Sequence, residues 1–81
     1  MKVVFAATAA EAFGELPKPV QERAAVSFGL LESHPKMYPV RRRGIMRGYR
    51  YFVAGAYLFY YSLSSSEIRI TAIIPGVMRH S

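Results

Sequence analysis

The stretch GYRYFVAGAYLFYYSL, residues 48–63, carries the strongest structural signal in the chain. It holds seven of the chain's eleven aromatic side chains, which are six Tyr and five Phe in all. Two-residue alternation places Tyr57, Phe59 and Tyr61 on one face, and Leu58 and Tyr60 on the other. Since both faces carry apolar bulk, we expect a central strand that is covered on one side and partly covered on the other. Core packing therefore explains most of these rings better than stacking on nucleic acid.

The flanking sequence predicts a sheet around this strand. Gly55 supplies the positive φ of a tight hairpin, so residues 45–54 and 57–63 are expected to pair as antiparallel strands. After the turn SLSSSE, residues 67–74 alternate between apolar and polar side chains, and residues 2–6 are rich in Val and Phe. One face of the last strand is expected to consist of Ile68, Ile70, Ala72 and Ile74.

Two helices are predicted between the first strand and the rest of the sheet. Thr8 and Glu11 fit a capping box at the start of the first helix, which Pro17 ends. Pro19 suits the first turn of the second helix, and Pro35 stops it. The apolar stripe of this second helix consists of Val20, Ala24, Phe28 and Leu31.

This order of elements predicts an α+β fold, β-α-α-β-β-β, in which a helical hairpin packs on one face of a mainly antiparallel sheet. The length of 81 residues allows one small domain, residues 1–81, with a limited core. With no cysteine, the chain must be held by that core and by a partner rather than by disulfides.

The charge of the chain is strongly uneven. The net charge is +6, and no acid lies between Glu32 and Glu67. The basic residues inside this gap are Lys36, Arg41, Arg42, Arg43, Arg47 and Arg50. We favour a surface that binds a polyanion or an acidic protein, with an ordinary solvated basic surface as the alternative. Tyr49 and Tyr51 lie beside these arginines and are candidates for the same binding face.

Few residues suggest catalysis. The chain has no Asp, no phosphate-binding glycine loop and no His/Glu spacing that would seat a metal, so we expect neither a metal nor a cofactor. His34 is expected to cap the end of the second helix. His80 beside Arg79 offers an acid-base group with a cation, as cleavage of an RNA phosphodiester requires. The alternative for His80 is a solvated side chain near the end of the sequence.

The apolar runs of the chain are short. The N-terminal run MKVVFAATAA continues into a charged, helix-like segment, so we expect no secretory signal. The apolar part of residues 48–63 is only about ten residues long and is interrupted by Gly55, so we expect no membrane span. We therefore expect a soluble, cytoplasmic protein.

Taken in order, these motifs resemble the RelE/ParE superfamily of type II toxin-antitoxin toxins. The resemblance rests on the N-terminal strand, four sequence motifs and one methionine, and it spans nearly the whole chain. These motifs are LPKPVQERA, LLESHP, IMRGYRYFVAGAYLFYYSL, EIRITAII and a Met four residues beyond the last of them. The motifs are diffuse, but their order and spacing make the resemblance fairly specific.

The resemblance implies a growth-inhibiting toxin of a plasmid- or chromosome-stabilising module. Its partner would be an acidic antitoxin that lays a flexible segment across the helical hairpin and sheet, forming a toxin-antitoxin hetero-oligomer. On the hairpin, the expected antitoxin contacts are Phe13, Leu16, Val20 and Phe28.

The superfamily has two branches with different targets. ParE-like members inhibit DNA gyrase, whereas RelE-like members cleave mRNA on the ribosome with basic residues and a C-terminal Arg, Tyr or His. Under the nuclease alternative, Arg50, Arg79 and His80 would form the catalytic set. However, Leu58 and Ser62 stand where RelE-like nucleases usually carry Arg, so the resemblance favours the ParE-like branch. A third alternative is an inactive member that only binds, and whether the chain is an enzyme stays open at this point.

Overall fold

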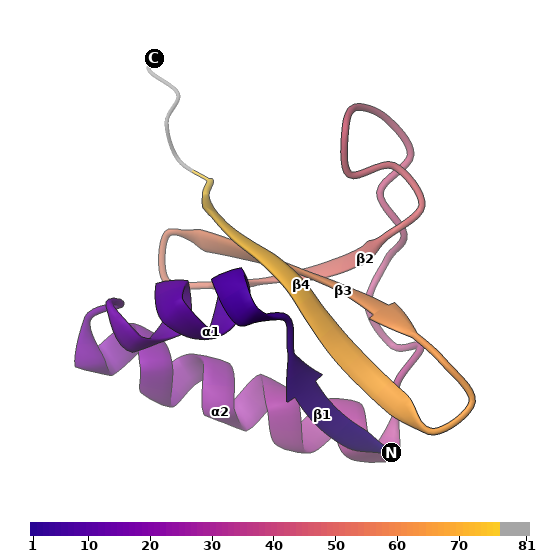
Figure 1. Ribbon diagram of the computed structural model, residues 1–81, viewed down its shortest axis with the longest axis horizontal. Coiled ribbons are helices and arrows are strands. Elements are labelled where there is room, and N and C mark those ends of the chain that lie inside the picture. The colour runs from indigo at the N-terminus through magenta and orange to yellow at the C-terminus, as the bar shows by residue number, and fades with distance from the viewer. Residues whose placement is uncertain (77–81) are drawn as a thin grey trace.

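The computed structural model describes residues 1–76, and its elements follow the predicted order (Figure 1). They are β1 (Lys2–Phe5), α1 (Ala7–Gly14), α2 (Lys18–Ser33), β2 (Arg50–Ala54), β3 (Tyr57–Leu63) and β4 (Glu67–Pro75). The strands lie in the order β1-β4-β3-β2, with β1 parallel to β4 and the other neighbours antiparallel. The predicted α+β class and the mainly antiparallel sheet are therefore confirmed.

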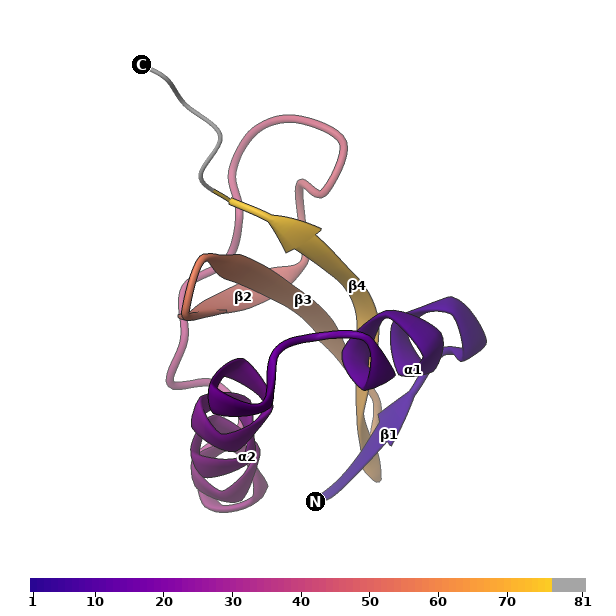
Figure 2. The same ribbon diagram turned by 90° about the vertical axis from the view of Figure 1, so that its left-hand side faces the viewer.

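Both helices lie on the same face of the sheet, which Figure 2 shows from the side. The amide Nε2 of Gln21 on α2 donates to the main-chain oxygen of Phe13 at 2.8 Å and so ties the two helices together. Between helices and sheet, the rings of Phe52 and Phe59 stack with centroids 4.9 Å apart. Phe28 of α2 meets both rings edge-on, at 5.9 and 6.0 Å. This aromatic contact joins the helical layer to the two strands of the β2–β3 hairpin.

The two helix starts differ in how well the sequence predicted them. The capping box is wrong: α1 begins at Ala7, its N-cap is Ala6, and no side chain caps it. Thr8 therefore lies inside the first turn. In α2, Pro19 does occupy the first turn, where its missing N–H costs nothing, and the helix ends at Ser33. His34 is the C-cap residue and donates its main-chain N–H to Leu30.

Strand β2 is shorter than predicted, because it begins at Arg50 rather than at residue 45. Gly44 and Gly48 have φ values of 86° and 93°, which a β-strand does not contain. Between them, the N–H of Arg47 donates to the oxygen of Gly44 at 3.1 Å and closes a turn. Residues 45–49 therefore belong to the loop that precedes the strand.

A β-bulge changes the faces of β4. Tyr60 pairs with Ala72 but Tyr61 pairs with Ile70, so Thr71 is an extra residue opposite β3. Ile68 and Ile70 face the helices as predicted and are fully buried. After the bulge the alternation reverses: Ile73 packs against the core, whereas Ala72 and Ile74 face away from the helices. The prediction that Ile68, Ile70, Ala72 and Ile74 share one face is therefore wrong for Ala72 and Ile74.

Two glycines offer a matched test of the packing between α2 and the β2–β3 hairpin. Gly55 has φ of 62°, and a Cβ added to it would lie 2.8 Å from Cγ2 of Val20. We expect Gly55→Ala to lower the free energy of unfolding by about 1–3 kcal/mol, through backbone strain and this collision. Gly29 lies in α2, where an added Cβ meets nothing within 4 Å. Gly29→Ala should raise the free energy of unfolding by about 0.5–1 kcal/mol.

Urea unfolding followed by circular dichroism measures both changes. If Gly55→Ala is as stable as the wild type, the close approach of the hairpin to α2 is wrong.

Candidate functional site

The loop of residues 36–49, called the basic loop here, is fastened to the outer edge of β2. Val40 forms an isolated antiparallel bridge with Arg50. The N–H of Arg41 donates to the oxygen of Tyr49 at 2.7 Å, and the N–H of Tyr51 donates to the oxygen of Pro39 at 3.1 Å. These bonds extend the sheet pairing by a few residues and hold the base of the loop. Its tip, which includes the turn from Gly44 to Arg47, projects away from the helices (Figure 1).

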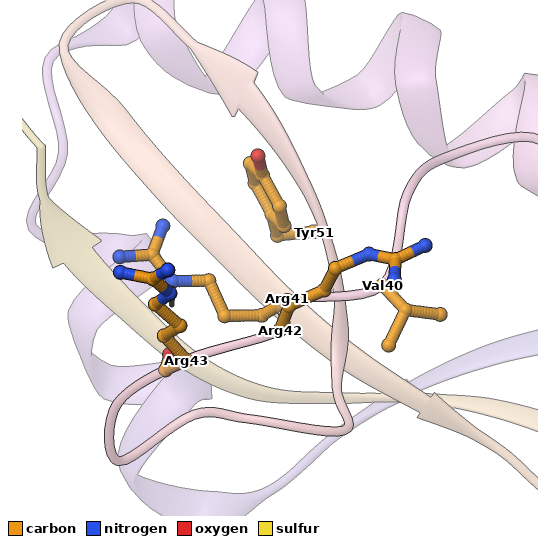
Figure 3. Close-up of a pocket in the computed structure, with 5 residues that line it drawn as sticks. All are labelled: Val40, Arg41, Arg42, Arg43 and Tyr51. Carbon is orange, nitrogen blue, oxygen red and sulfur yellow. Dashed lines mark hydrogen bonds between the residues drawn. The ribbon is translucent and has the colours of Figure 1, made fainter.

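Three arginines and one tyrosine form a hollow at the base of this loop (Figure 3). It has a volume of about 390 Å³, and its lining residues are Val40, Arg41, Arg42, Arg43 and Tyr51. The guanidinium carbon of Arg41 lies 5.8 Å from the centre of the Tyr51 ring, which is a cation–π distance. The Nε of Arg41 also donates to the main-chain oxygen of Arg43 at 3.3 Å, which orients its planar head. We call this the basic hollow.

The basic hollow is suited to an anionic ligand. Within residues 1–76, the only ion pair joins Arg69 to Glu67 at 3.8 Å, so no carboxylate neutralises the three arginines. Guanidinium groups present several donors in a plane, which matches carboxylate and phosphate oxygens. The arrangement can bind an acidic side chain or a phosphate, and the ring of Tyr51 adds an apolar floor.

Arg50 lies apart from the basic hollow. It pairs with Tyr61 on the face of β2 that looks toward the helices. Its Nη1 donates to the main-chain oxygens of Tyr38 at 2.7 Å and Lys36 at 3.3 Å. The hydroxyl of Tyr61 donates to the oxygen of Pro35 at 3.1 Å. Through these bonds, Arg50 and Tyr61 hold the start of the basic loop against the sheet. The guanidinium of Arg50 is therefore occupied by main-chain oxygens of the chain itself.

The remaining predicted target residues are dispersed. Arg47 is exposed near the tip of the basic loop, and Tyr49 is half-buried beside its base. Neither lines the basic hollow. The structure thus brings four of the predicted residues together, namely Arg41, Arg42, Arg43 and Tyr51. Arg79 and His80 lie outside the described residues.

The residues predicted to contact an antitoxin pack mainly inside the domain. Phe13, Leu16, Val20 and Phe28 are all half-buried and lie against the core. The rings of Phe13 and Phe28 are 5.8 Å apart, and Phe28 also contacts the sheet. The apolar side chains that are exposed form a different set, which the sequence reasoning missed. On the strands, this set contains Val53 and Ile74, and on α2 it contains Val26 and Leu30.

The described part of the chain shows no group of three or more His or Glu side chains that could hold a metal ion. None of its helices has the length and apolar character needed to cross a membrane.

The structural role of Arg50 can be tested against another arginine of the same loop region. Arg50→Met keeps the apolar stem but removes both hydrogen bonds from Nη1 to main-chain oxygens, so we expect the free energy of unfolding to fall by about 1–2 kcal/mol. Arg47→Met, at the exposed tip, should change it by less than about 0.5 kcal/mol. Urea titration of both variants gives the comparison, and equal effects would contradict the role assigned to Arg50.

Burial raises the pKa of the Tyr61 hydroxyl above its ordinary value of 10.0, and the nearby Arg50 cation partly offsets this rise. The folded chain therefore holds this proton more tightly than the unfolded chain. Its contribution to stability is complete below pH 10 and is lost as the pH rises through the folded pKa. We expect the free energy of unfolding to fall less steeply above pH 10 in Tyr61→Phe than in the wild type. Identical slopes in denaturant titrations would refute this assignment.

The sequence matches no model of a known protein family. A search of curated proteins likewise finds no match. The likeness to RelE/ParE toxins therefore stays a prediction drawn from the order and spacing of the sequence motifs.

Proposed function

We propose that the chain is the toxin of a type II toxin-antitoxin module and that it inhibits growth by binding DNA gyrase. The target-binding surface in this proposal is the basic hollow with the exposed tip of the basic loop. Its partner in the resting cell would be an acidic antitoxin, and the two would form a cytoplasmic hetero-oligomer. The observation that supports a binding function is the hollow itself, which three arginines and Tyr51 line and where no carboxylate within residues 1–76 pairs with an arginine.

The distribution of charge supports an acidic or polyanionic partner at this surface. Residues 36–50 contain six basic side chains and no acid. The two helices and their connection, residues 7–33, contain four Glu against one Lys and one Arg, which gives −2. One side of the molecule is therefore basic and the opposite side is slightly acidic. Such a separation steers a partner of negative charge toward the basic loop.

Binding is favoured over RNA cleavage by the positions of three residues. Leu58 and Ser62 pair with Ile74 and Arg69 on the face of β3 that looks away from the helices. The resemblance implies that RelE-like nucleases carry Arg at the Leu58 and Ser62 positions, where a cation would stabilise the charge of the transition state. Arg50, the remaining strand-borne arginine of the catalytic set, donates to main-chain oxygens within the domain.

Expression of the chain in a bacterium should stop growth, and the purified protein should inhibit DNA supercoiling by gyrase. The triple change Arg41→Gln, Arg42→Gln and Arg43→Gln should weaken this inhibition at least tenfold, because it removes the charge of the basic hollow. The matched control replaces three exposed basic residues elsewhere, Lys2, Lys18 and Arg23, by Gln and removes the same total charge. This control should inhibit gyrase like the wild type.

Two outcomes would contradict the proposal. Cleaved mRNA in a translation extract, with supercoiling unaffected, would identify the nuclease alternative. Normal growth, together with full gyrase activity, would identify a member that only binds.

A further inference from the structure

The tip of the basic loop carries the most exposed large apolar side chain of residues 1–76. Ile45 is 96% exposed, compared with 67% for Val26, the next in order. Met46 follows Ile45 in the chain and is half-buried. Single exposed apolar side chains are ordinary on a flat protein surface. Ile45 is different because the loop that carries it projects away from the helices in both views of the chain (Figure 1, Figure 2).

Main-chain hydrogen bonds hold the tip in one shape. The N–H of Arg47 donates to the oxygen of Gly44 at 3.1 Å, which places Ile45 at the first middle position of a turn. The N–H of Gly48 donates to the oxygen of Arg41 at 2.9 Å and closes the loop behind this turn. The apolar end of the loop is therefore preformed, and little further ordering is needed when it binds.

Cationic side chains lie on both sides of this apolar end. Arg42 and Arg43 precede the turn, Arg47 completes it, and all three residues are exposed. The sequence has no acid between Glu32 and Glu67, so no carboxylate of the loop offsets these charges. The tip thus combines an apolar end with guanidinium donors on either side of it.

This combination matches the boundary region of an anionic lipid bilayer. There, a layer of phosphates lies directly above apolar acyl chains, and peripheral proteins bind by inserting apolar side chains while cations contact the headgroups. The long stem of arginine keeps its charged end among the phosphates while a shorter apolar side chain reaches deeper. Shallow insertion also suits a turn, because water in the headgroup region hydrates main-chain groups that the acyl region would leave unpaired.

From this arrangement we infer that the tip of the basic loop binds the surface of an anionic phospholipid membrane. Ile45 and Met46 enter the boundary between headgroups and acyl chains, and Arg42, Arg43 and Arg47 contact the lipid phosphates. The inference stands apart from the proposed function, since lipid alone satisfies it. Because the proposed target uses the same tip, a chain held on a membrane would not bind that target.

Charge and shape favour a lipid surface over other occupants. A second copy of the chain would bring two sets of the same three arginines together, where like charges repel. Nucleic acid would satisfy the arginines, but it offers Ile45 an apolar environment only where its bases are unstacked, which costs free energy. A protein would need one apolar pocket with acidic groups on both sides of it. An anionic bilayer presents this arrangement over its whole surface.

Tryptophan fluorescence tests insertion directly, because the chain has no Trp of its own. With vesicles of equal parts phosphatidylcholine and phosphatidylglycerol, the emission of Ile45→Trp should shift to shorter wavelength, and lipids brominated in their acyl chains should quench it. The matched control is Val26→Trp on α2, which should show neither change. No shift at position 45 would overturn the inference even if the chain sediments with the vesicles, since the contact would then rest on charge alone. An equal response at position 26 would also overturn it.

Vesicle sedimentation measures what the apolar side chain contributes. Ile45→Ser should weaken binding to the same vesicles at least tenfold, because the side chain that enters the boundary is lost. Val26→Ser removes a similar exposed side chain from α2 and should bind like the wild type. Both side chains are exposed, so both variants should remain folded, which circular dichroism verifies. Undiminished binding by Ile45→Ser would contradict the inference.

A second pair of variants tests the contribution of the arginines. Changing all three tip arginines to Gln should weaken binding at least tenfold, because each cation near an anionic surface contributes separately. The matched control removes the same charge from exposed residues elsewhere, namely Lys2, Lys18 and Arg23. This control should weaken binding by less than about threefold, since its charges lie farther from the membrane. Equal losses in the two variants would show that only net charge matters and would overturn the inference.

Other occupants would give other results, and each would overturn the inference. A shift in the emission of Ile45→Trp with duplex DNA but not with vesicles would identify nucleic acid. Loss of gyrase inhibition in Ile45→Ser, without vesicle binding by the wild type, would identify a pocket on a protein target. Light scattering that shows a dimer broken by Ile45→Ser would identify a second copy.

Discussion

The structure depends on the packing of β3, the strand with apolar side chains on both of its faces. Phe59 and Tyr61 are fully buried beneath the helices, and Tyr60, on the opposite face, is 3% exposed. The stacked pair of Phe59 and Phe52 fixes the β2–β3 hairpin, and Phe28 locks α2 onto that pair. With only two helices, the described chain covers one face of this strand completely. The face of β3 that looks away from the helices is covered only by side chains of neighbouring residues and by any molecule that binds there.

Two local features decide what the second face presents. The bulge at Thr71 lets β4 give two isoleucines to the core before it and one after it, so Ile74 reaches the outer face. Arg50 and Tyr61 fasten the start of the basic loop from the helix side. Arg41 thereby lies over the ring of Tyr51, and Arg42 and Arg43 line the same hollow with exposed side chains. The candidate site is thus a consequence of how the sheet is built.

Much of this fold follows from the pattern of the sequence, because the physical signals are local. The Pro19 helix start, the glycine of the β2–β3 turn and the apolar stripe of α2 each act within a few residues. The bulge at Thr71 could not be predicted, since a one-residue slip leaves the apolar pattern intact while it exchanges the faces. The start of β2 was also missed, because the aromatic run hides the positive φ of Gly44 and Gly48.

The site was predicted in part for a similar reason. The basic cluster is visible in the sequence, and four of its residues do meet in one hollow. The orientation of the Arg50 side chain could not be predicted from the sequence, because it depends on main-chain oxygens of residues 36 and 38, more than ten residues away. The half-buried position of Phe13 and Phe28 likewise depends on packing between layers. Outward-facing apolar residues become recognisable only when the strand register is known.

The central claim is that the bulge turns Ile73 toward the core and Ile74 toward the outer face, and one measurement tests it most directly. The chain has no cysteine, so Ile73→Cys and Ile74→Cys each introduce a unique thiol. We expect the thiol at position 74 to react with a disulfide reagent at least ten times faster than the thiol at position 73 in the folded protein. Faster reaction at position 73 would show that β4 alternates without a bulge, and Ile74 would then face the core.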